Sequence, residues 1–413
     1  MKPELLFLCH RIPYPPNKGD KIRSWHLFEE LGKDFRIHLG TFIDDPADTE
    51  YIPYLDSLCT SSCYVRLSPA LARVRSLPAL LTGRSLSEYY YHSRALHAWV
   101  RSLLRREAVS RALVFSSPMA QYVLKNAGAF ERKIIDFVDV DSDKWSQYAR
   151  TRKKPMDLVY RREADKLLAF DREVARDFDY SFFVSREEAE LFAGIAPESA
   201  TKVRYFSNGV DLDYFRPSET VASPYTGNGP ILVFTGAMNY WPNVDAACWF
   251  AREIFPSVRA RYPDVEFFVV GANPAPEVRR LGDLEGVTVT GTVADVRPYI
   301  QHASAAVVPM RIARGIQNKV LEAMAMARPL VATTQGLEGI NPQIGRDVVL
   351  ADDAAAFGAA VNDLLSGEYP ELGASARQFV MEGFHWQENI RPLRQLLHNG
   401  PESLKPESLR KVI

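Results

Sequence analysis

The chain has 413 residues, of which 46% are hydrophobic and 24% are charged, and its formal net charge is −1. These values are typical of a globular protein with two ordinary α/β domains. A net charge near zero does not indicate a partner of either charge, and it gives no basis for expecting that the protein binds a nucleic acid.

The cysteines and the apolar runs bear on the cellular compartment. Four cysteines (Cys9, Cys59, Cys63 and Cys248) are too scattered to make a disulfide framework, and no His/Cys pair completes a zinc site near the C-x3-C spacing. The N-terminal apolar run is too short for a signal peptide, and no stretch reaches the roughly eighteen apolar residues of a spanning helix. We therefore expect a reduced, cytoplasmic compartment, with any membrane contact peripheral.

The first half of the sequence alternates predicted strands and helices. Short apolar runs predict buried parallel strands, and apolar residues every three or four positions predict helices. The predicted strands are ELLFLCH (4–10), FRIHLGTF (35–42), ALVFSS (112–117), KIIDFVDV (133–140), YSFFVS (180–185) and KVRYFSNGV (202–210). The predicted helices are residues 21–34, most of 66–111, residues 143–177 with a break at Pro155, and residues 186–195.

A second α/β series follows a stretch rich in Pro, Ser, Thr and Gly (213–230), which predicts an interdomain linker. Its predicted strands are ILVFTGAM (231–238), VEFFVVG (265–271), VTVTGTV (287–293), SAAVVPM (304–310) and PLVATT (329–334). Its predicted helices are residues 243–263, with Asn243 as the N-cap, and residues 274–284, 295–303 and 317–327. The pattern predicts two doubly wound α/β domains.

Charge is distributed unevenly along the chain. Residues 66–176 hold 22 Lys and Arg against 12 Asp and Glu, so the rest of the chain is strongly acidic. This asymmetry is consistent with an anionic partner for the first half, and equally with solvated helix faces.

Glycines stand at the predicted ends of several strands, where ligands bind in open α/β sheets. Gly19 lies in the loop after the first strand, and Gly236, Gly271 and Gly291 end strands of the second half. Glycine allows the backbone to approach a ligand closely, although each one taken alone is explained equally well as part of a turn. Neither G-x-G-x-x-G nor G-x-x-x-x-G-K-[ST] occurs, which disfavours a dinucleotide dehydrogenase and a P-loop nucleotide hydrolase.

The stretch RGIQNKVLEAMA (314–325) predicts a phosphate site where a strand is followed by a helix. A helix N-terminus offers unpaired N–H groups and partial positive charge, and Arg311, Arg314 and Lys319 add full charges there. Glu322 lies one helical step beyond Lys319, where a carboxylate suits sugar hydroxyls better than phosphate. The pattern favours a nucleoside diphosphate, although a surface Lys–Glu pair without function also fits it.

Four segments together resemble a known enzyme family: KVRYFSNGVDLDYFRP, FTGAMNYWPNVDA, VTVTGTVADVRPYIQHASAAVVPM and GIQNKVLEAMAMARPLVATTQGLEGI. They are similar to glycosyltransferases of family 4 with the GT-B fold. RIPYPPNKGDKIRSWHL and IIDFVDVDSDKW add a likeness to the sugar transferases of bacterial exosortase/PEP-CTERM exopolysaccharide loci. The resemblance implies two Rossmann-like doubly wound domains facing across a cleft, with retention of anomeric configuration and no cofactor or metal.

The resemblance also implies a domain plan. We expect an acceptor-binding domain at residues 1–215, a linker at 216–229 and a donor-binding domain at 230–385. A C-terminal helix at 386–400 is expected to return to the first domain, and residues 401–413 form a tail.

The donor site implied by the resemblance centres on Glu322, which would bind the ribose, and on Lys319 at the diphosphate. The family motif has a glutamate eight positions before Glu322, where this chain has Arg314, so backbone N–H groups of Gly315 and Ile316 are expected to take part of its role. The segment MNYWPNVD (238–245) after Gly236 contains no Lys or Arg, and Arg311, Arg314 and Lys319 are expected to compensate. The implied donor-binding residues are Gly19, Gly236, Val293, Arg311, Gly315, Ile316, Lys319 and Glu322.

The acceptor side is expected to use residues beyond strand ends of the first domain. Lys18, Lys21 and Arg23 flank Gly19 and would contact phosphate or an anionic acceptor. Asp139 and Asp141 follow a strand, where either would position or deprotonate the acceptor hydroxyl, or would cap the next helix. His10 is a weaker candidate. Asp139, Lys319 and Arg314 form the expected catalytic set.

The sequence thus predicts a retaining hexosyltransferase that moves sugar from a nucleoside diphosphate sugar to an exopolysaccharide precursor, with a lipid-linked or polysaccharide acceptor. The Arg-rich helices within residues 66–176, RALHAWVRSLLRR above all, suit peripheral contact with the anionic inner face of the cytoplasmic membrane. Two alternatives stay open: another enzyme on the same fold, such as a nucleotide-sugar 2-epimerase or a phosphorylase, and a non-catalytic donor-binding subunit.

Overall fold

The computed structural model describes residues 2–151 and 154–399, so the expected tail at 401–413 lies outside the described residues. The chain divides into two compact units. The first unit comprises Met1–Phe206 together with Ile390–Ile413, and the second comprises Ser207–Asn389. The division thus falls at Phe206, whereas the sequence analysis placed the end of the first domain at residue 215.

The first unit is built on a fully parallel seven-stranded sheet in the order β3-β2-β1-β4-β5-β6-β7. Its strands are β1 (Glu4–Cys9), β2 (Arg36–Ile43), β3 (Ser61–Arg66), β4 (Arg111–Phe115), β5 (Arg132–Val138), β6 (Tyr180–Phe183) and β7 (Val203–Tyr205). Six of these were predicted. The edge strand β3, with the sequence SSCYVR, was missed because its polar residues hide the apolar pattern.

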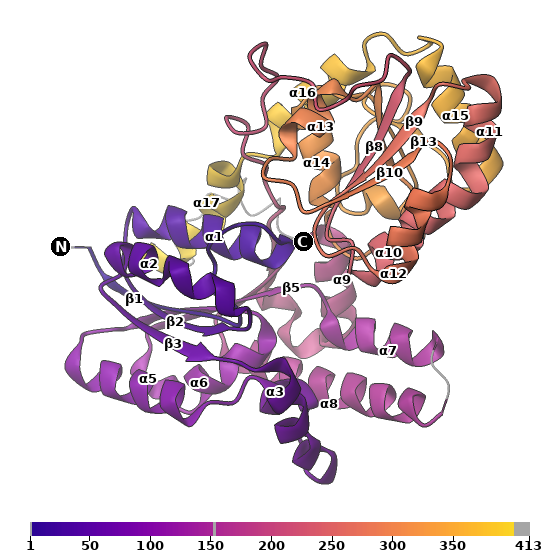
Figure 1. Ribbon diagram of the computed structural model, residues 1–413. Coiled ribbons are helices and arrows are strands. Elements are labelled where there is room, and N and C mark those ends of the chain that lie inside the picture. The colour runs from indigo at the N-terminus through magenta and orange to yellow at the C-terminus, as the bar shows by residue number, and fades with distance from the viewer. Residues whose placement is uncertain (1, 152–153, 400–413) are drawn as a thin grey trace. The chain divides into compact units, whose positions relative to one another are not determined.

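Helices cover both faces of this sheet, as parallel strands require. In Figure 1, α1 and α2 lie on one face, and α5 and α6 lie on the other. The helical elements are α1 (Gly19–Gly32), η1 (Pro46–Tyr51), α2 (Ile52–Leu58), α3 (Pro69–Ser76), η2 (Leu77–Leu81), α4 (Leu86–Tyr90), α5 (Arg94–Arg106), η3 (Ser117–Ala120), α6 (Gln121–Leu124), η4 (Ala127–Ala129), α7 (Asp141–Thr151), α8 (Met156–Asp177), α9 (Arg186–Ile195), η5 (Pro197–Lys202) and, from Ile390 onward, α17 (Trp386–Asn399).

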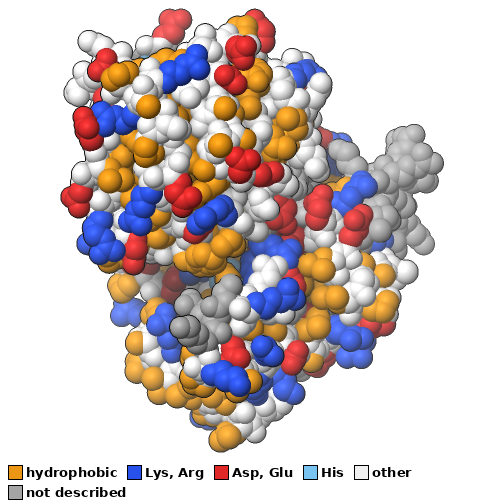
Figure 2. Space-filling view, turned by 90° about the vertical axis from the view of Figure 1, so that its right-hand side faces the viewer, with side chains coloured by type: hydrophobic (Ala, Val, Ile, Leu, Met, Phe, Trp, Pro, Cys, Tyr) orange, Lys and Arg blue, Asp and Glu red, His pale blue; other side chains and the backbone are white. Residues whose placement is uncertain are grey.

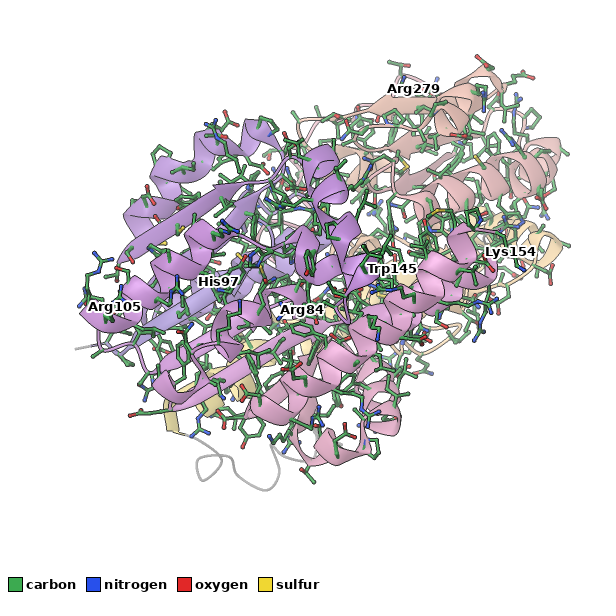
Figure 3. The ribbon with its side chains drawn as sticks, turned by 90° about the horizontal axis from the view of Figure 1, so that it is seen from below. Arg84, His97, Arg105, Trp145, Lys154 and Arg279 are labelled. Carbon is green, nitrogen blue, oxygen red and sulfur yellow. The ribbon has the colours of Figure 1, made fainter. Side chains whose placement is uncertain are left out.

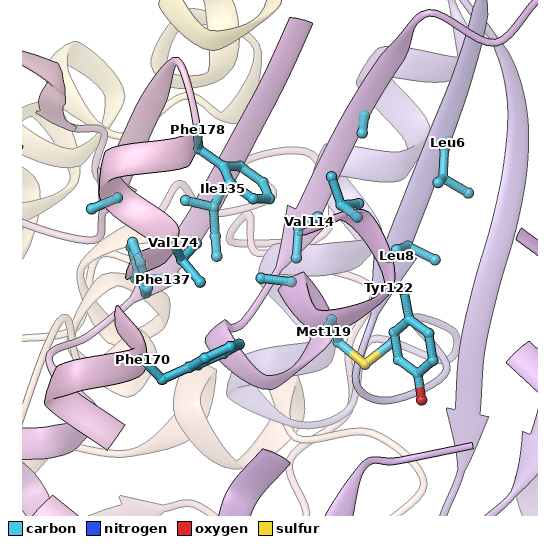
Figure 4. Close-up of a cluster of buried hydrophobic side chains, with 14 of the residues drawn as sticks. Leu6, Leu8, Val114, Met119, Tyr122, Ile135, Phe137, Phe170, Val174 and Phe178 are labelled. Atoms are coloured by element: carbon cyan, nitrogen blue, oxygen red, sulfur yellow. The ribbon is translucent and has the colours of Figure 1, made fainter. Parts of the chain in front are cut away.

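The core of the first unit lies between the central strands and the helices beneath them (Figure 4). Leu8 and Val114 from the strands meet Met119 and Tyr122 from the η3–α6 segment. Phe170, from the long helix α8, joins the same cluster. Burial of such side chains is the main force that holds helices onto a parallel sheet.

The second unit repeats the plan with a fully parallel six-stranded sheet in the order β10-β9-β8-β11-β12-β13. Its strands are β8 (Ile231–Thr235), β9 (Glu266–Val270), β10 (Val287–Gly291), β11 (Ala305–Val308), β12 (Leu330–Ala332) and β13 (Val349–Leu350). Its helical elements are α10 (Trp241–Trp249), the π-helical segment η6 (Phe250–Ile254), α11 (Phe255–Arg261), α12 (Pro276–Arg279), η7 (Arg280–Asp283), α13 (Arg297–His302), α14 (Asn318–Ala325), η8 (Gln335–Leu337), α15 (Ala354–Leu365) and α16 (Leu372–Gly383).

Two parallel, doubly wound sheets confirm the predicted fold class of two Rossmann-like units. Within the described ranges, we find no helix that is both long and apolar enough to span a bilayer.

Candidate active site

The carboxyl end of the second sheet contains a topological switch point between β8 and β11. From β8 the chain proceeds to β9 on one side, and it later returns to place β11 on the other side. Open α/β sheets bind ligands in the crevice that this reversal creates. Gly236 follows β8 directly, and the loop that contains Arg311, Arg314 and Gly315 follows β11.

Gly236 and Gly271 allow the ends of β8 and β9 to approach each other closely. A Cβ on Gly271 would stand 1.7 Å from the Gly236 carbonyl oxygen. A Cβ on Gly236, where φ is +154°, would stand 2.7 Å from Nδ2 of Asn243 and 3.5 Å from Cε of Lys319. Both positions therefore require glycine, and Gly236 leaves room for the two polar side chains at the switch point.

Lys319 is the second residue of α14, which begins at Asn318. Its Nζ donates a hydrogen bond to Oδ1 of Asn243 at 2.8 Å and lies 5.2 Å from the centroid of the Phe234 ring. Burial lowers the pKa of Lys319 to about 8, although Glu322 opposes the shift. The predicted basic group therefore stands at the helix start, and its hydrogen-bond acceptors, Asn243, Gln317 and Met310, are all neutral.

Glu322 lies one helical step after Lys319 on the same helix and is half-buried. Burial raises the pKa of its carboxyl to about 7, and the nearby Lys319 charge opposes that rise. A carboxyl and an ammonium with pKa values displaced toward each other are typical of a functional site.

Asn243 differs from its predicted role as a helix N-cap. The helix α10 begins two residues earlier, at Trp241, with Pro242 in the first turn. The Asn243 amide instead donates to the Ala237 carbonyl at 3.0 Å and accepts from Lys319. The sequence offered no signal for this contact, because Lys319 is 76 residues away along the chain.

Arg311 does not add free charge to the switch point. Its guanidinium forms a bidentate ion pair with Asp245 of α10, with N–O distances of 2.6 and 3.0 Å, and lies 5.2 Å from the Trp249 ring centroid. Asp245 therefore compensates the charge that the sequence analysis assigned to phosphate.

Arg314 pairs with Glu338, which follows η8 after the neighbouring strand β12. The shortest N–O distance is 3.9 Å, and both side chains are half-buried. Next to it, Gly315 is buried with φ +64° and Ile316 is buried. The structure thus brings a carboxylate, Glu338, to the position beside Arg314, and this residue was not predicted.

Val293 lies apart from these residues in sequence, in the loop that joins β10 to α13. It is half-buried. Since β10 is an edge strand, two strands separate its end from β11.

The first unit has its own switch point between β1 and β4. His10 follows β1 and stacks on Phe115 at the end of β4. Its Nε2 lies 3.3 Å from Oδ2 of Asp20, and its buried Nδ1 has no hydrogen-bond partner. This residue, ranked low from the sequence, therefore occupies the place where the topology favours a ligand.

Gly19 and Lys18 mark the start of α1, where Lys18 is the N-cap residue. Gly19 is exposed, and nothing lies within 4 Å of a Cβ built on it. Lys18 is half-buried.

Lys21 and Arg23, which were expected to contact phosphate or an anionic acceptor, are buried and paired with carboxylates. Lys21 forms an ion pair with Asp48 at 2.7 Å. Arg23 binds both carboxylate oxygens of Asp136, at 2.7 and 3.1 Å, and donates to the Phe206 carbonyl. Each side chain is 1% exposed, so Lys21 ties α1 to η1 and Arg23 ties α1 to β5 of the sheet.

Asp139 and Asp141 share one cation, Lys144 of α7, at 2.6 and 3.0 Å. Burial alone would lower the pKa of Lys144, but the two carboxylates raise it well above its usual value. The other oxygen of Asp139 is buried without a hydrogen-bond partner. The structure therefore brings both predicted acids together and adds a lysine that was not predicted.

Comparison with known proteins identifies the domain that carries the site at the carboxyl end of the second sheet. Residues 229–367 match the family model described as glycosyl transferases group 1. They include β8, Gly236, Lys319 and Glu322. The second unit therefore carries a glycosyl transferases group 1 domain, and the two parallel sheets together have the architecture of the GT-B fold.

Solved structures support this fold over almost the whole chain. Sucrose-phosphate synthase of Thermosynechococcus elongatus is 19% identical with a TM-score of 0.72, over 96% of this chain and 98% of that one. HepE of Anabaena, solved in complex with UDP-glucose, is 14% identical with a TM-score of 0.62, over 97% and 100%. WaaG, a glycosyltransferase involved in lipopolysaccharide biosynthesis, is 13% identical with a TM-score of 0.61, over 96% and 100%. No curated protein matches this chain significantly.

Proposed function

We propose that this glycosyltransferase transfers a hexose, with retention of anomeric configuration, from a nucleoside diphosphate sugar to a lipid-linked exopolysaccharide precursor. The observation that carries the proposal is the arrangement of Lys319, Asn243 and Glu322 at the switch point of the second sheet. A cation held by a neutral amide at a helix start suits a diphosphate, and a carboxylate one helical step further suits a ribose.

The donor in this proposal is a uridine diphosphate sugar. Support comes from HepE, which has been solved with UDP, with UDP and glucose, and with UDP-glucose. Lys319 and the N–H groups at the start of α14 hold the diphosphate, and Glu322 accepts hydrogen bonds from the ribose hydroxyls.

Glu338 takes the role that an upstream glutamate fills in related sequences. Arg314 occupies the position of that glutamate and binds Glu338, which places a carboxylate at the ends of β11 and β12. In the proposal, Glu338 accepts hydrogen bonds from the donor sugar, and Arg314 orients it.

The chemical step breaks the bond between the anomeric carbon and the diphosphate oxygen, and forms a bond from that carbon to the acceptor oxygen. Negative charge grows on the leaving diphosphate, so a preorganised cation lowers the barrier most. Lys319 supplies that cation, and no metal or cofactor is needed. The acceptor proton passes to the leaving phosphate, or to a carboxylate such as Asp139 in the role that the sequence analysis predicts for it.

The acceptor and the location rest on the sequence resemblance to family 4 and to exosortase/PEP-CTERM exopolysaccharide transferases. WaaG, a structural neighbour, takes part in lipopolysaccharide biosynthesis, which supports an acceptor of the cell envelope. The protein acts in the cytoplasm, at the inner face of the cytoplasmic membrane.

A donor screen followed by turnover tests this function. Purified protein is screened with nucleoside diphosphate sugars by thermal shift, because a ligand that binds only the folded state raises the melting temperature. Release of nucleoside diphosphate from the best donor, with acceptor lipid present, is then measured, and NMR reads the anomeric configuration of the product. A new sugar epimer formed from donor alone would indicate an epimerase, and binding without turnover would indicate a donor-binding subunit.

Lys319→Ala should lower turnover by about two orders of magnitude, because it removes the cation that faces the leaving diphosphate. Arg311→Ala is the matched control, since Asp245 already compensates Arg311, and it should lower turnover by less than about fivefold. Equal losses in both variants would remove Lys319 from its role.

A further inference from the structure

A short helical segment of the first unit, made of α3 and η2 (Pro69–Leu81), turns its small residues inward. Ala72, Ser76 and Ala79 are buried. The large apolar residues point outward instead, and Leu81 is 94% exposed and Leu71 71% exposed. Of the 16 exposed large hydrophobic side chains among the described residues, five lie in these 13 residues: Leu71, Val74, Leu77, Leu80 and Leu81. Such a cluster is a sign of an interaction surface.

We call this segment the α3–η2 prong, and the charged side chains of residues 66–87, which include it, are all positive. Between Arg66 and Ser87 the sequence contains four arginines and no acidic residue. All four, Arg66, Arg73, Arg75 and Arg84, are exposed. Exposed leucines flanked by arginines match a bilayer that presents anionic headgroups above an apolar interior.

Two adjacent residues of α8 hold the prong in place. Arg162 donates hydrogen bonds to the carbonyls of Ala79, Thr82 and Arg84, where η2 ends. Glu163 accepts from the backbone N–H groups of Leu86 and Ser87, at the start of α4. The outward leucines therefore belong to an anchored element.

The prong leaves the sheet at the carboxyl end of β3. The parallel strands β1 and β5 present His10 and Asp139 beyond the same edge. In Figure 1, α3 and the segment after it form the lowest part of the first unit, and Figure 2 shows hydrophobic side chains at that end with Lys and Arg side chains above them. Figure 3 looks onto this end from below, with Arg84 near its middle.

The Arg-rich helix expected to face the membrane is a weaker candidate than the prong. Leu96, Val100 and Leu103 of α5 are buried against the core, so this helix offers its arginines without an apolar face. A second copy of the chain also fits poorly, because a two-fold contact through the prong would bring like-charged arginines together.

We propose that the α3–η2 prong inserts its leucines into the apolar zone of an anionic bilayer while its arginines bind lipid phosphates. This proposal deepens the proposed function, because it identifies the surface that docks on the membrane. It rests on the proposed function for the lipid-linked acceptor. Binding to vesicles needs neither donor nor acceptor, so the two proposals fail independently.

Vesicle co-sedimentation of the full chain tests the insertion. Wild type should bind phosphatidylglycerol/phosphatidylethanolamine vesicles, and bind phosphatidylcholine vesicles at least about tenfold more weakly. Leu71→Gln/Leu77→Gln/Leu81→Gln should reduce binding to the anionic vesicles about tenfold or more. Leu284→Gln/Ile344→Gln, which alters exposed apolar residues of the second unit, is the control and should bind as wild type does.

A variant that lacks two of the arginines separates the electrostatic part of the membrane contact from the apolar part. Arg73→Gln/Arg84→Gln should weaken binding to anionic vesicles and reduce its salt dependence, with the thermal melt unchanged. Circular dichroism confirms that each variant is folded. Wild-type vesicle affinity in the triple leucine variant would overturn the proposal. It would also be overturned if the wild type bound no vesicles but formed a dimer in sedimentation velocity, and the triple leucine variant were monomeric.

Discussion

Lys319 and Arg311 are two cations near one strand end, and their partners distinguish them. Arg311 is bound by the carboxylate of Asp245, whereas Lys319 donates to the amide of Asn243. An amide orients an ammonium without neutralising it, so Lys319 keeps its charge for an anionic ligand. The hydrogen-bond or ion-pair partner of each cation, more than its position in the sequence, therefore decides which cation can bind the donor diphosphate.

Donor affinity should be highest between about pH 7 and about pH 8. Lys319, with its pKa near 8, loses its positive charge above that window, and Glu322, with its pKa near 7, loses its negative charge below it. Affinity should fall by up to about tenfold per pH unit on either side, since each limb is linked to one proton. Calorimetric titration with the donor from pH 5.5 to 9.5 measures this.

Two variants assign the limbs of that pH profile. Lys319→Arg should move the alkaline limb upward, because a guanidinium stays protonated, and Glu322→Gln should abolish the acid limb. A profile that neither variant alters would show that other groups control donor binding.

Glu338→Gln should weaken binding of the nucleoside diphosphate sugar by about tenfold, while binding of the nucleoside diphosphate alone changes less than about twofold. The reason is that Glu338 is proposed to contact only the sugar. Glu322→Gln is the matched control and should weaken both ligands, since the ribose belongs to both. Equal effects of Glu338→Gln on the two ligands would contradict the sugar contact.

At the scale of elements, sequence patterns predicted most strands and helices, because apolar periodicity is local information. Contacts between distant segments were not predictable in this way. Lys21 and Arg23 follow an exposed glycine and read as surface cations, but their partners Asp48 and Asp136 are 27 and 113 residues further along the chain. Glu338 was likewise missed because only the packing of β11 beside β12 brings it to Arg314.

Gly236→Ala tests how strand geometry supports the site. The added Cβ would stand 2.7 Å from the Asn243 amide, which must then move together with Lys319. Turnover should fall by about tenfold or more, with a loss of stability near 1 kcal/mol from the unfavourable φ. Steady-state kinetics and a thermal melt measure both effects.

The control for that variant is Gly282→Ala, where nothing lies within 4 Å of the new Cβ. It should match wild type in turnover. Wild-type turnover in Gly236→Ala as well would show that Asn243 moves aside without consequence.

At the scale of the whole molecule, the proposed donor contacts belong mostly to one unit. Hydrogen exchange of the full chain with and without UDP should show protection near residues 236–245 and 310–325. Additional protection of residues 17–22 would support the donor contact that the resemblance assigns to Gly19. Protection confined to the first unit would contradict the placement of the donor site.

The helix α17 contributes Ile390, Leu393, Leu396 and Leu397 to the buried interior of the first unit. Arg111 at the start of β4 also donates to the Leu397 carbonyl at 2.8 Å. During synthesis the first unit leaves the ribosome before the second, yet it lacks these residues until nearly the whole chain has been translated. The unit that is made first is therefore completed last, and a nascent chain truncated before Ile390 would expose part of its core to chaperones and proteases.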